Sequence, residues 1–516
     1  MRTRRGIAAH PINGGRYLPV PTSLPNRARI ESALLSRSAS DTLAFVDLDR
    51  RWSWSAFVGD ALELAARLED AGVRPGERIA TYIDQSAEWA LSFYAIWLVG
   101  GIAVPIHPGL RNAQVEHILD DSGATLLLTT VRRRSTLSIE LPATLLVEEA
   151  AVVVRKFEPL LLPGGDQAAA ILYTSGSTGR PKGILISHSN LIAGARIVSR
   201  YLALSPSDRL LGVLPFSFDY GLNQLLGATA NGAALILQRS HLPADICRML
   251  EAECVTVMAA VPPLWIQMMG RFSPFMRMQF PALRAITNTG GVFPVELTSA
   301  VSKQQPDLEV FLMYGLSEAF RSSYLKPLLA NEKSSSIGQA IPETELFVLD
   351  VNGRECAEGE VGELVHAGPT VAQGYWNSPE ATDAVFRPHP FDPEERAVWS
   401  GDLVKKDADG DLYFVGRNDQ MIKTRGFRVS PDEVEELIRE SGIVAEVAVQ
   451  GVPDADIGAR LVAHVVAIDE ATFDVNELLC FCQESMPRYM VPSQVDVRDA
   501  LPLTSSGKID RKRLAS

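Results

Sequence analysis

Helical and strand-like patterns of apolar residues alternate along the first half of the chain. Residues 56–72 (AFVGDALELAARLEDAG) place apolar side chains on one face of a helix, which predicts an amphipathic helix. The run 78–83 (RIATYI) predicts a strand, 90–101 (ALSFYAIWLVGG) a buried helix and 125–130 (TLLLTT) another strand. Alternation of this kind is typical of parallel sheets covered by helices.

One predicted strand leads into an unusual loop. The strand is 169–175 (AAILYTS), and six consecutive Ser, Thr and Gly residues follow from Thr174 to Gly179. A helix is predicted after the loop over 189–202 (SNLIAGARIVSRYL). The loop should therefore lie at the carboxyl end of a strand, where open α/β sheets bind their ligands.

The pattern changes twice in the second half. Beyond residue 340, short strands and turns with Gly-Glu and Asp-Gly pairs predict a smaller β-rich region. From about residue 418 a separate unit is predicted, with helices at 430–441 and 476–486 and strands at 444–452 and 460–468.

We therefore predict an α/β protein with two domains. At 516 residues the chain exceeds what one hydrophobic core normally supports. The large N-terminal domain, residues 1–416, should consist of helix-covered sheets plus a β-rich subdomain. A small α+β C-terminal domain, residues 417–516, should follow after a hinge.

Composition narrows the function. A net charge of −13 leaves no electrostatic footprint for nonspecific nucleic-acid binding, so we expect no nucleic-acid partner, and any polyanion site must be a local group of positive charges. The five cysteines fit neither a zinc ribbon nor a redox pair, which favours reduced thiols in a cytoplasmic protein. The most apolar stretch, 90–106, is interrupted and short, so no membrane span is expected.

The chemistry of the loop points to phosphate binding. Gly, Ser and Thr offer backbone N–H groups and hydroxyls that suit phosphate oxygens, and Lys182 adds a mobile positive charge. A P-loop NTPase is disfavoured, because Arg180-Pro181 precede Lys182 and Gly183 follows it. A flexible linker would not need the strand before it and the helix after it.

The loop also belongs to a set of motifs. YTSGSTGRPKG resembles the phosphate-loop signature of the adenylate-forming superfamily, which includes acyl-CoA synthetases, peptide-synthetase adenylation domains and firefly luciferase. Further segments resemble that superfamily in the same order: LPFSFDYGLNQL, MYGLSEA, GELVHAGPTVAQGYWN, WSGDLV, YFVGRNDQMIKTRGFRVSPDEVEE and LPLTSSGKIDRK. The resemblance covers essentially the whole chain after residue 30, and is strongest to bacterial AMP-forming acyl-CoA ligases associated with exosortase systems, and somewhat weaker to stand-alone prolyl carrier-protein ligases.

The resemblance implies a reaction in two halves. A carboxylate attacks the α-phosphate of ATP to give an acyl-AMP and pyrophosphate, and a thiol then displaces AMP to give a thioester. The implied ATP-binding residues are Thr174, Ser175, Gly176, Ser177, Thr178, Gly179, Lys182, Gly290, Gly291, Tyr314, Gly315, Ser317, Asp402 and Arg417. Within this set, the loop and Lys182 would hold the β- and γ-phosphates, Ser317 the α-phosphate, and Asp402 with Arg417 the ribose. Tyr314 would stack on adenine opposite Gly290-Gly291.

The resemblance also assigns catalytic, metal and thiol roles. Lys508 would bridge the substrate carboxylate and the α-phosphate, which makes Lys508, Lys182 and Glu318 the implied catalytic residues. Glu318 and Thr178 would bind Mg²⁺. Asp419 would be the hinge about which the C-terminal domain turns between the two half-reactions, and Gly426 and Arg428 would then meet the thiol.

The acid and the thiol stay open. The implied acyl pocket contains Phe218, Asp219, Tyr220, Asn223, Asn288, Phe311 and Met313. Asp219 is either the partner of a substrate ammonium, as in peptide-synthetase domains, or a cap on the following helix. No carrier domain follows the Lys508 motif in this sequence, so we expect the thiol to come from CoA, a separate carrier protein or a partner enzyme.

The leading prediction is an AMP-forming acyl-CoA synthetase that uses ATP, Mg²⁺ and CoA, in the setting of natural-product assembly that solitary ligases of this kind often serve. The alternative enzyme is an amino-acid ligase for a discrete carrier protein. A nucleotide-binding protein without catalysis is disfavoured, because Lys182, Glu318, Asp402, Arg417 and Lys508 occur together.

Overall fold

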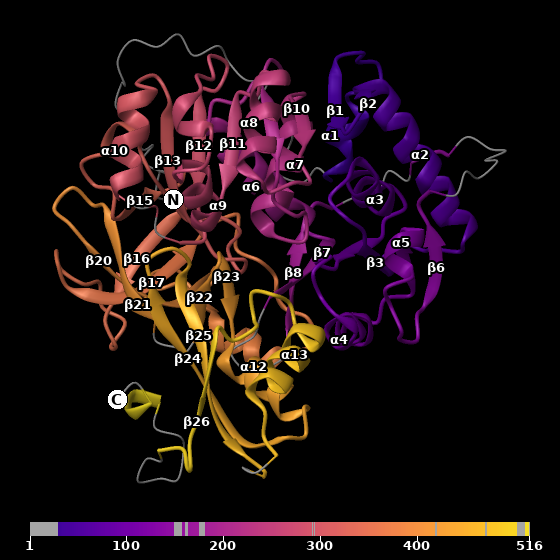
Figure 1. Cartoon of the computed structure of the whole chain (residues 1–516). Helices are drawn as coiled ribbons and strands as arrows, with labels where there is room; N and C mark the ends of the chain where they lie inside the picture. The colour runs from indigo at the N-terminus through magenta and orange to yellow at the C-terminus, as the bar shows by residue number, and fades with distance from the viewer. Residues whose placement is uncertain are drawn as a thin grey trace.

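The architecture is taken from a computed structural model of the whole chain (Figure 1). The structure describes residues 29–148, 157–159, 164–174, 181–291, 293, 295–417, 421–469, 472–502 and 511–514. Four sheets lie within these residues, two of them large and two small. The α/β class, with a large N-terminal and a small C-terminal domain, is as the sequence predicts.

The first large sheet has seven strands in the order β18-β8-β7-β4-β3-β5-β6. The strands are β3 (Arg78–Tyr82), β4 (Ile102–Pro105), β5 (Leu126–Thr129), β6 (Ala143–Leu146), β7 (Ala168–Thr174), β8 (Lys182–Ser187) and β18 (Gly374–Tyr375). From β7 to β6 all neighbours run parallel, as the alternating pattern predicts. Strand β8 was not predicted, and it pairs antiparallel with β7. The Ser/Thr/Gly loop therefore joins two neighbouring antiparallel strands, not a strand to a helix.

The second large sheet has fourteen strands and changes character along its width. Strands β1, β10, β9, β11, β12 and β13 run parallel, and the strands beyond β13 pair antiparallel. This antiparallel half is the β-rich subdomain that the turn-rich sequence predicts. The strands are β1 (Leu43–Asp47), β2 (Arg50–Ser53), β9 (Arg209–Gly212), β10 (Ala234–Leu237), β11 (Val257–Ala260), β12 (Ala285–Asn288), β13 (Glu309–Tyr314), β14 (Ser323–Leu325), β15 (Ser336–Ala340), β16 (Glu345–Leu349), β17 (Val361–Ala367), β19 (Phe386–Pro388), β20 (Arg396–Lys406) and β21 (Leu412–Arg417).

Helices cover the parallel parts of both sheets (Figure 1). The helix predicted over 56–72 is α2 (Trp54–Asp70), whose first turn is capped by the Ser53 hydroxyl. It packs on α3 (Ala87–Leu98), which is buried along its whole length. The other helices are α1 (Glu31–Leu35), α4 (Asn112–Ser122), α5 (Val131–Arg134), α6 (His188–Tyr201), α7 (Asp219–Asn231), α8 (Pro243–Ala252), α9 (Pro262–Met269), α10 (Val295–Gln304) and α11 (Pro379–Val385).

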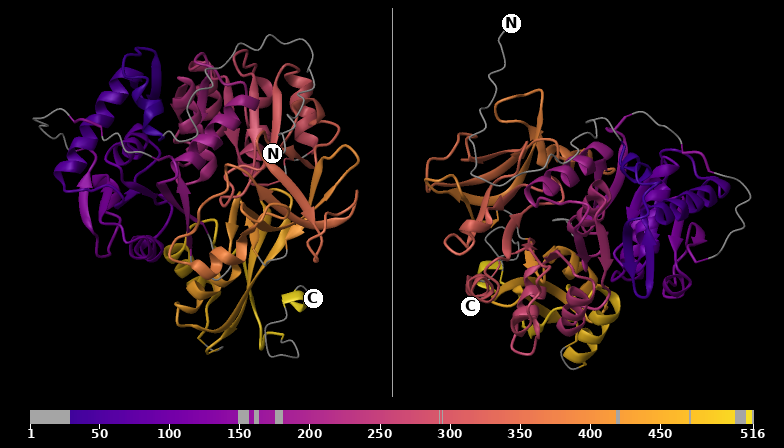
Figure 2. Two further views of the ribbon diagram at one scale, coloured as in Figure 1. Left: turned by 180° about the vertical axis from the view of Figure 1, so that it is seen from behind. Right: turned by 90° about the horizontal axis from the view of Figure 1, so that it is seen from above.

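The C-terminal domain lies beneath the larger domain in Figure 1 and has its own core. Strands β24 (Val444–Asp454), β25 (Gly458–Ala467) and β26 (Gln494–Val497) form its sheet, with α12 (Pro431–Arg439) and α13 (Val475–Ser485). The hairpin β22 (Ile422–Thr424) and β23 (Phe427–Val429) comes before them and reaches toward the larger domain. The two views of Figure 2 show the same placement of this domain from behind and from above. The boundary at 416/417 stays a prediction.

Two sequence-based expectations concern the environment of the protein. All five cysteines lie in the described part of the chain and are free of disulfide bonds. Among the described residues, no helix is both long enough and apolar enough to cross a lipid bilayer.

Candidate active site

Three connected cavities lie between the sheets of the larger domain and the C-terminal domain. We name them the polar cavity (about 350 Å³), the inner cavity (about 140 Å³) and the interdomain cleft (about 1220 Å³). The polar and inner cavities share Thr174, Leu316 and Arg428 in their walls. The inner cavity and the cleft share His107, Leu110, Phe427 and Tyr489. The three cavities are therefore neighbours, each separated from the next by shared side chains.

The polar cavity gathers residues that the sequence assigns to ATP. Thr174, Lys182, Glu318 and Arg417 line it, although Thr174 and Arg417 are separated by most of the larger domain in sequence. Thr174 ends β7 and Lys182 begins β8, and the two residues are register partners across that pair of strands. Both ends of the Ser/Thr/Gly loop therefore meet this cavity.

A buried carboxylate lies next to Gly401 and Arg417 of the cavity wall. Asp402 on β20 is fully buried, and its carboxylate accepts hydrogen bonds from the Tyr314 hydroxyl and from Nη1 of Arg417. Asp402 and Arg417 are register partners on β20 and β21, which fixes their contact through the sheet. Burial raises the pKa of Tyr314 well above its ordinary value, and the neighbouring Asp402 charge raises it further. The predicted ribose ligand, its helper and the predicted adenine platform are thus one hydrogen-bonded cluster.

A second carboxylate lies close to this cluster. The Tyr375 hydroxyl donates to Oε1 of Glu318 at 2.8 Å, and Oε2 of Glu318 lies 3.7 Å from Nη1 of Arg428. Oε2 is buried and has no hydrogen-bond partner in the part of the chain that the structure describes. Burial lowers the pKa of Lys182, while the Glu318 charge opposes that shift. A carboxylate oxygen with a free lone pair beside the predicted phosphate-binding lysine fits the ligand set of a hard cation such as Mg²⁺.

The inner cavity contains a buried ion pair. Asp219 and Arg321 both line it, with 4% and 2% of their side chains exposed, and Arg321 Nη1 lies 3.5 Å from Asp219 Oδ2. Asp219 occupies the first turn of α7, and the residue at the N-cap position is Phe218, which makes no side-chain cap hydrogen bond. Burial raises the pKa of Asp219, and the Arg321 charge opposes that rise. The aspartate singled out in the sequence therefore already has a cationic neighbour.

The other predicted acyl-pocket residues lie at different depths. Phe218 lines the inner cavity with Asp219, whereas Tyr220, Asn223, Asn288, Phe311 and Met313 are buried and do not appear in its wall. The Tyr220 hydroxyl is hydrogen-bonded to that of Thr287 on β12, and the Tyr201 hydroxyl donates to Sδ of Met313. These groups form the layer that supports the cavity.

The β22–β23 hairpin of the C-terminal domain contacts the larger domain at this site. Its turn holds Arg425 and Gly426 with positive φ angles of 52° and 84°. A Cβ on Gly290 would lie 3.4 Å from the Gly426 carbonyl oxygen, and one on Gly426 would lie 3.1 Å from Cβ of Val261. Two glycines, one from each domain, thus permit close contact between the domains. Arg428 follows in the hairpin and reaches both Glu318 and Asp402, with Nη2 3.5 Å from the latter.

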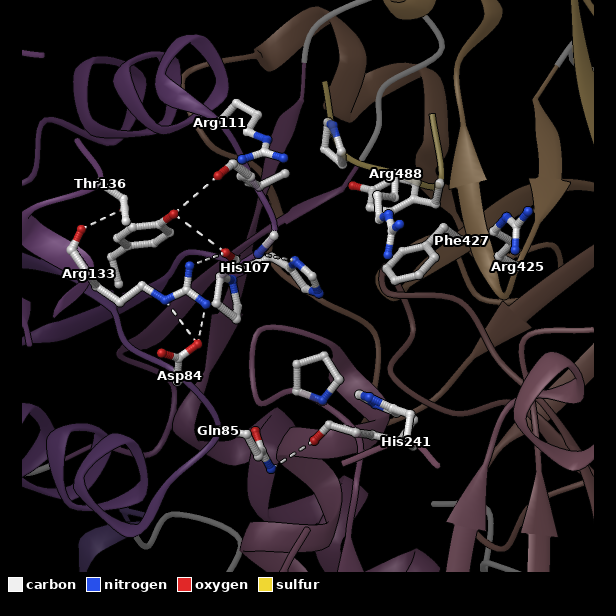
Figure 3. Close-up of a pocket in the computed structure, with 18 of the residues that line it drawn as sticks. Asp84, Gln85, His107, Arg111, Arg133, Thr136, His241, Arg425, Phe427 and Arg488 are labelled. Atoms are coloured by element: carbon white, nitrogen blue, oxygen red, sulfur yellow. Dashed lines mark hydrogen bonds and ion pairs between the residues drawn. The ribbon is translucent and has the colours of Figure 1, made fainter. Parts of the chain in front are cut away.

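The interdomain cleft is bordered by arginines from both domains (Figure 3). Arg425, Phe427 and Arg488 face Arg111 and His107 across it. Arg133 also lines the cleft, and its Nε donates a hydrogen bond to the Asp84 carboxylate. Arg111, Arg425 and Arg488 are exposed and form no ion pair with any described carboxylate. Phe427 and Tyr489 line both the cleft and the inner cavity, and their rings stack with centroids 4.0 Å apart. His107, which also lines both, packs edge-on against the two rings.

Several predicted site residues fall outside the described residues. These are Ser175, Gly176, Ser177, Thr178, Gly179, Asp419 and Lys508. Their assigned roles stay predictions. Of the remaining ATP-site residues, Gly290, Gly315 and Ser317 line the inner cavity, and Gly291 accepts a hydrogen bond from Nδ2 of Asn288.

Four site residues were not predicted. Tyr375 binds Glu318, Arg321 pairs with Asp219, and Lys423 and Glu433 line the inner cavity. Burial lowers the pKa of Lys423 to about 8 and raises that of Glu433 to about 8. Tyr375, Lys423 and Glu433 lie inside motifs of the sequence, and that position is the signal that could have identified them. Arg321 follows the MYGLSEA motif by two residues, but only the fold brings it to its partner 102 residues away.

Comparison with known proteins places these motifs in a family. Residues 34–376 match the family described as AMP-binding enzyme, and residues 433–508 match the AMP-binding enzyme C-terminal domain. The chain is 32% identical over 509 residues to novobiocin biosynthesis protein H of Streptomyces niveus, a match that covers 96% of this chain and 83% of that protein. It is also 30% identical over 458 residues to gramicidin S synthase 2 of Aneurinibacillus migulanus, a match that covers 88% of this chain but only 10% of that protein.

Solved structures give the same fold. The o-succinylbenzoate CoA synthetase of Bacillus subtilis, a double mutant bound with its product analogue, is 26% identical and has a TM-score of 0.85, covering 95% of this chain and 98% of that one. The same synthetase in complex with its acyl-adenylate intermediate, at the same identity and coverage, has a TM-score of 0.70. The overall arrangement of this chain is therefore closer to the product-analogue complex.

Proposed function

Because the chain belongs to the family of AMP-binding enzymes and is an adenylate-forming ligase, we propose that it converts a carboxylic acid to an acyl-adenylate and then transfers the acyl group to CoA. In the first step a carboxylate oxygen bonds to the α-phosphorus of ATP and the bond to pyrophosphate breaks. In the second, the thiol sulfur bonds to the acyl carbon and AMP leaves. The first step needs charge neutralisation more than a strong base, since the carboxylate is already ionised near neutral pH.

The polar cavity suits the first step. Lys182 and the ends of the Ser/Thr/Gly loop offer positive charge and donors to the phosphates, and the Asp402 cluster offers a carboxylate to the ribose hydroxyls. Glu318 would hold Mg²⁺ through its free Oε2, and the ion would offset charge on the phosphate oxygens. Lys508 stays the proposed lysine that bridges carboxylate and α-phosphate.

The observation that carries the choice of CoA is the interdomain cleft. CoA has a phosphorylated nucleotide at one end and a narrow pantetheine arm that ends in the thiol. The cleft presents Arg111, Arg425 and Arg488 in its walls and shares His107, Phe427 and Tyr489 with the inner cavity. These exposed arginines from both domains would attract the nucleotide phosphates, and the arm would reach the inner cavity beside the shared rings.

The arrangement of the domains supports an acyl-transfer state. The hairpin with Gly426 and Arg428 lies against Gly290, Glu318 and Asp402, where the thiol would have to arrive. The higher TM-score with the product-analogue complex of the Bacillus subtilis synthetase agrees with this assignment.

The alternative is a ligase that loads an amino acid onto a separate carrier protein. Gramicidin S synthase 2 is among the relatives, and Asp219 occupies a position suited to a substrate ammonium. The Arg321 guanidinium disfavours this alternative, because it lies 3.5 Å from Asp219 and would repel a second cation.

The test compares thiol acceptors. Pyrophosphate release identifies an accepted acid, and thioester formation is then measured with CoA, with pantetheine and with a panel of carrier proteins that bear a phosphopantetheine arm. We expect the double variant Arg425→Glu, Arg488→Glu to raise KM for CoA about tenfold, which is roughly 1.4 kcal/mol, and to leave KM for pantetheine unchanged.

Arg460→Glu is the matched control, since Arg460 is an exposed arginine of the same domain outside the cleft. Equal use of CoA and pantetheine by the wild type would contradict the role of the cleft. A thioester formed only on a carrier protein would favour the alternative ligase.

A further inference from the structure

Three polar residues of the larger domain lie together in sequence or as an ion pair in the wall of the inner cavity. They are Ser217, Asp219 and Arg321. The Arg321 side chain is only 2% exposed, so its charge is almost completely removed from water. Burying a guanidinium costs several kcal/mol unless partners satisfy it.

The orientation of Arg321 is fixed on three sides. The Tyr220 ring lies under the guanidinium, with Cζ of Arg321 4.6 Å from the ring centroid. Nη1 faces Asp219. Gly315 supplies the room, because a Cβ there would lie 3.2 Å from Cα and 3.3 Å from Nη1 of Arg321. A guanidinium that stacks through its face keeps its N–H groups in the plane for hydrogen bonding.

The remaining edge of the guanidinium is free. Nε and Nη2 of Arg321 are buried and have no hydrogen-bond partner among the described residues, and the same is true of the Ser217 hydroxyl. Nε and Nη2 lie on the same side of the guanidinium and form the fork that binds two carboxylate oxygens at once. The single long contact to Asp219 leaves this fork unused.

A purely structural pair would look different. A buried arginine that serves the fold normally has its donors satisfied by carboxylates or backbone carbonyls, since each orphan donor costs about 1–3 kcal/mol. Arg321 instead keeps this fork unpaired, and it lies in the wall of the inner cavity, which also contains the predicted α-phosphate residue Ser317. This arrangement is what a site for a missing acceptor requires.

We propose that the acid activated by this ligase carries a second carboxylate, which pairs side-on with Nε and Nη2 of Arg321 while the first carboxylate reacts with ATP. The proposal rests on the function proposed above and adds the substrate class. Asp219 then serves as a positioning residue that holds Nη1, and Ser217 adds a hydroxyl donor to the same group. Arg428 lies close enough to Asp219 for its charge to act on that carboxylate, which helps offset the added negative charge.

The experiment measures pyrophosphate release with matched acids. A series of linear and aromatic dicarboxylic acids is compared with the corresponding acids in which one carboxylate is replaced by a methyl group or a primary amide. We expect kcat/KM for the best dicarboxylic acid to exceed that of its methyl analogue by at least about 100-fold, because a buried fork without its acceptor is left unpaired.

Variants of Arg321 test whether the preference for dicarboxylic acids depends on that residue. Arg321→Gln should lower kcat/KM for the dicarboxylic acid by about 100-fold or more. The ratio of kcat/KM for the dicarboxylic acid to kcat/KM for its monoamide should also fall. Arg321→Lys should restore only part of the activity, because an ammonium lacks the fork. Asp219→Asn keeps Arg321 and should retain the dicarboxylate preference, with an altered KM. Thermal unfolding of each variant shows whether it is folded.

The outcomes separate the two proposals. No pyrophosphate with any acid, or no thioester with CoA, would overturn the proposed function. Turnover of monocarboxylic acids as good as that of the dicarboxylic acids would overturn the Arg321 proposal alone. A preference for α-amino acids, abolished by Asp219→Asn, would overturn it as well and assign Asp219 to an ammonium.

Discussion

Removal of the buried Asp402 charge tests the hydrogen-bonded cluster beside the polar cavity. Asp402 is fully buried and is the counter-ion of Arg417, whose side chain is 10% exposed. It also lies 3.5 Å from Nη2 of Arg428 and accepts from the Tyr314 hydroxyl. Asp402→Asn keeps the shape of the side chain but removes its charge. Its amide then has one acceptor oxygen for the Tyr314 hydroxyl and the guanidinium groups of Arg417 and Arg428.

The expected cost follows from these contacts. Breaking a buried ion pair by removing one partner typically costs about 3–5 kcal/mol, which is a large share of the roughly 5–15 kcal/mol that stabilises a folded domain. The loss of the Asp402 charge should also lower the pKa of Lys423 further, since that charge now raises it. We expect the unfolding free energy of the larger domain to fall by about 3 kcal/mol and ATP binding to weaken in the same variant.

The chain offers a convenient assay. All seven tryptophans precede Ser400, so urea unfolding followed by tryptophan emission reports on the larger domain. Calorimetric titration with ATP measures binding below the unfolding transition. Asp411→Asn is the matched control, because Asp411 is 2% exposed and pairs with Lys333, which lies outside all three cavities.

Two results would refute the reasoning. A loss of less than about 1 kcal/mol in Asp402→Asn would mean that the pair adds no net stability in its buried setting. Equal loss of ATP affinity in Asp411→Asn would mean that binding responds to general destabilisation and not to the Asp402 carboxylate.

Two further predictions concern the C-terminal domain. Gly426→Ala should slow acyl transfer to CoA at least about tenfold while leaving pyrophosphate release unchanged, because its Cβ would press on Val261 of the larger domain. Gly442 also has a positive φ, 71° against 84° for Gly426, but open space around it, so Gly442→Ala should leave both rates unchanged. Burial raises the pKa of Glu433 from 4.5 to about 8, so the folded state keeps a proton that the unfolded state has lost, and stability falls as the pH rises through that window. The unfolding free energy of Glu433→Gln minus that of the wild type should therefore rise by at least about 1.4 kcal/mol from about pH 5 to about pH 9. Urea titrations followed by circular dichroism measure this difference. A difference that does not change with pH would contradict the prediction.

Regular periodicity made much of the fold predictable. The helix predicted over 56–72 is observed at Trp54–Asp70, and the strand predicted over 78–83 at Arg78–Tyr82, because one-sided burial imposes a period on the sequence. Strand β8 was missed between the Ser/Thr/Gly loop and α6. Its apolar run, Ile184 to Ile186, is short, and the loop and the helix on either side have stronger signals.

The candidate site was predictable only where residues act within motifs. Asp402 and Arg417 meet because their strands are neighbours, so a motif match on each was enough. Arg321 was missed for a physical reason, since it lies between β13 and β14 without periodicity and its role depends on Asp219 of a distant helix. The arginines of the cleft come from separate segments of both domains, and only the packing of those domains gathers them.

The residues proposed to select the acid and the acceptor belong mostly to different domains, which has an evolutionary consequence. Ser217, Asp219 and Arg321 belong to two short segments of the larger domain, whereas Arg425, Phe427 and Arg488 belong to the smaller one. Under the proposed roles, mutations in the first group would change which acid is chosen, and mutations in the second would change the acceptor. Descendants of such a gene would then acquire a new acid or a new acceptor one at a time, and recombination near the domain border would exchange one trait while inheriting the other intact.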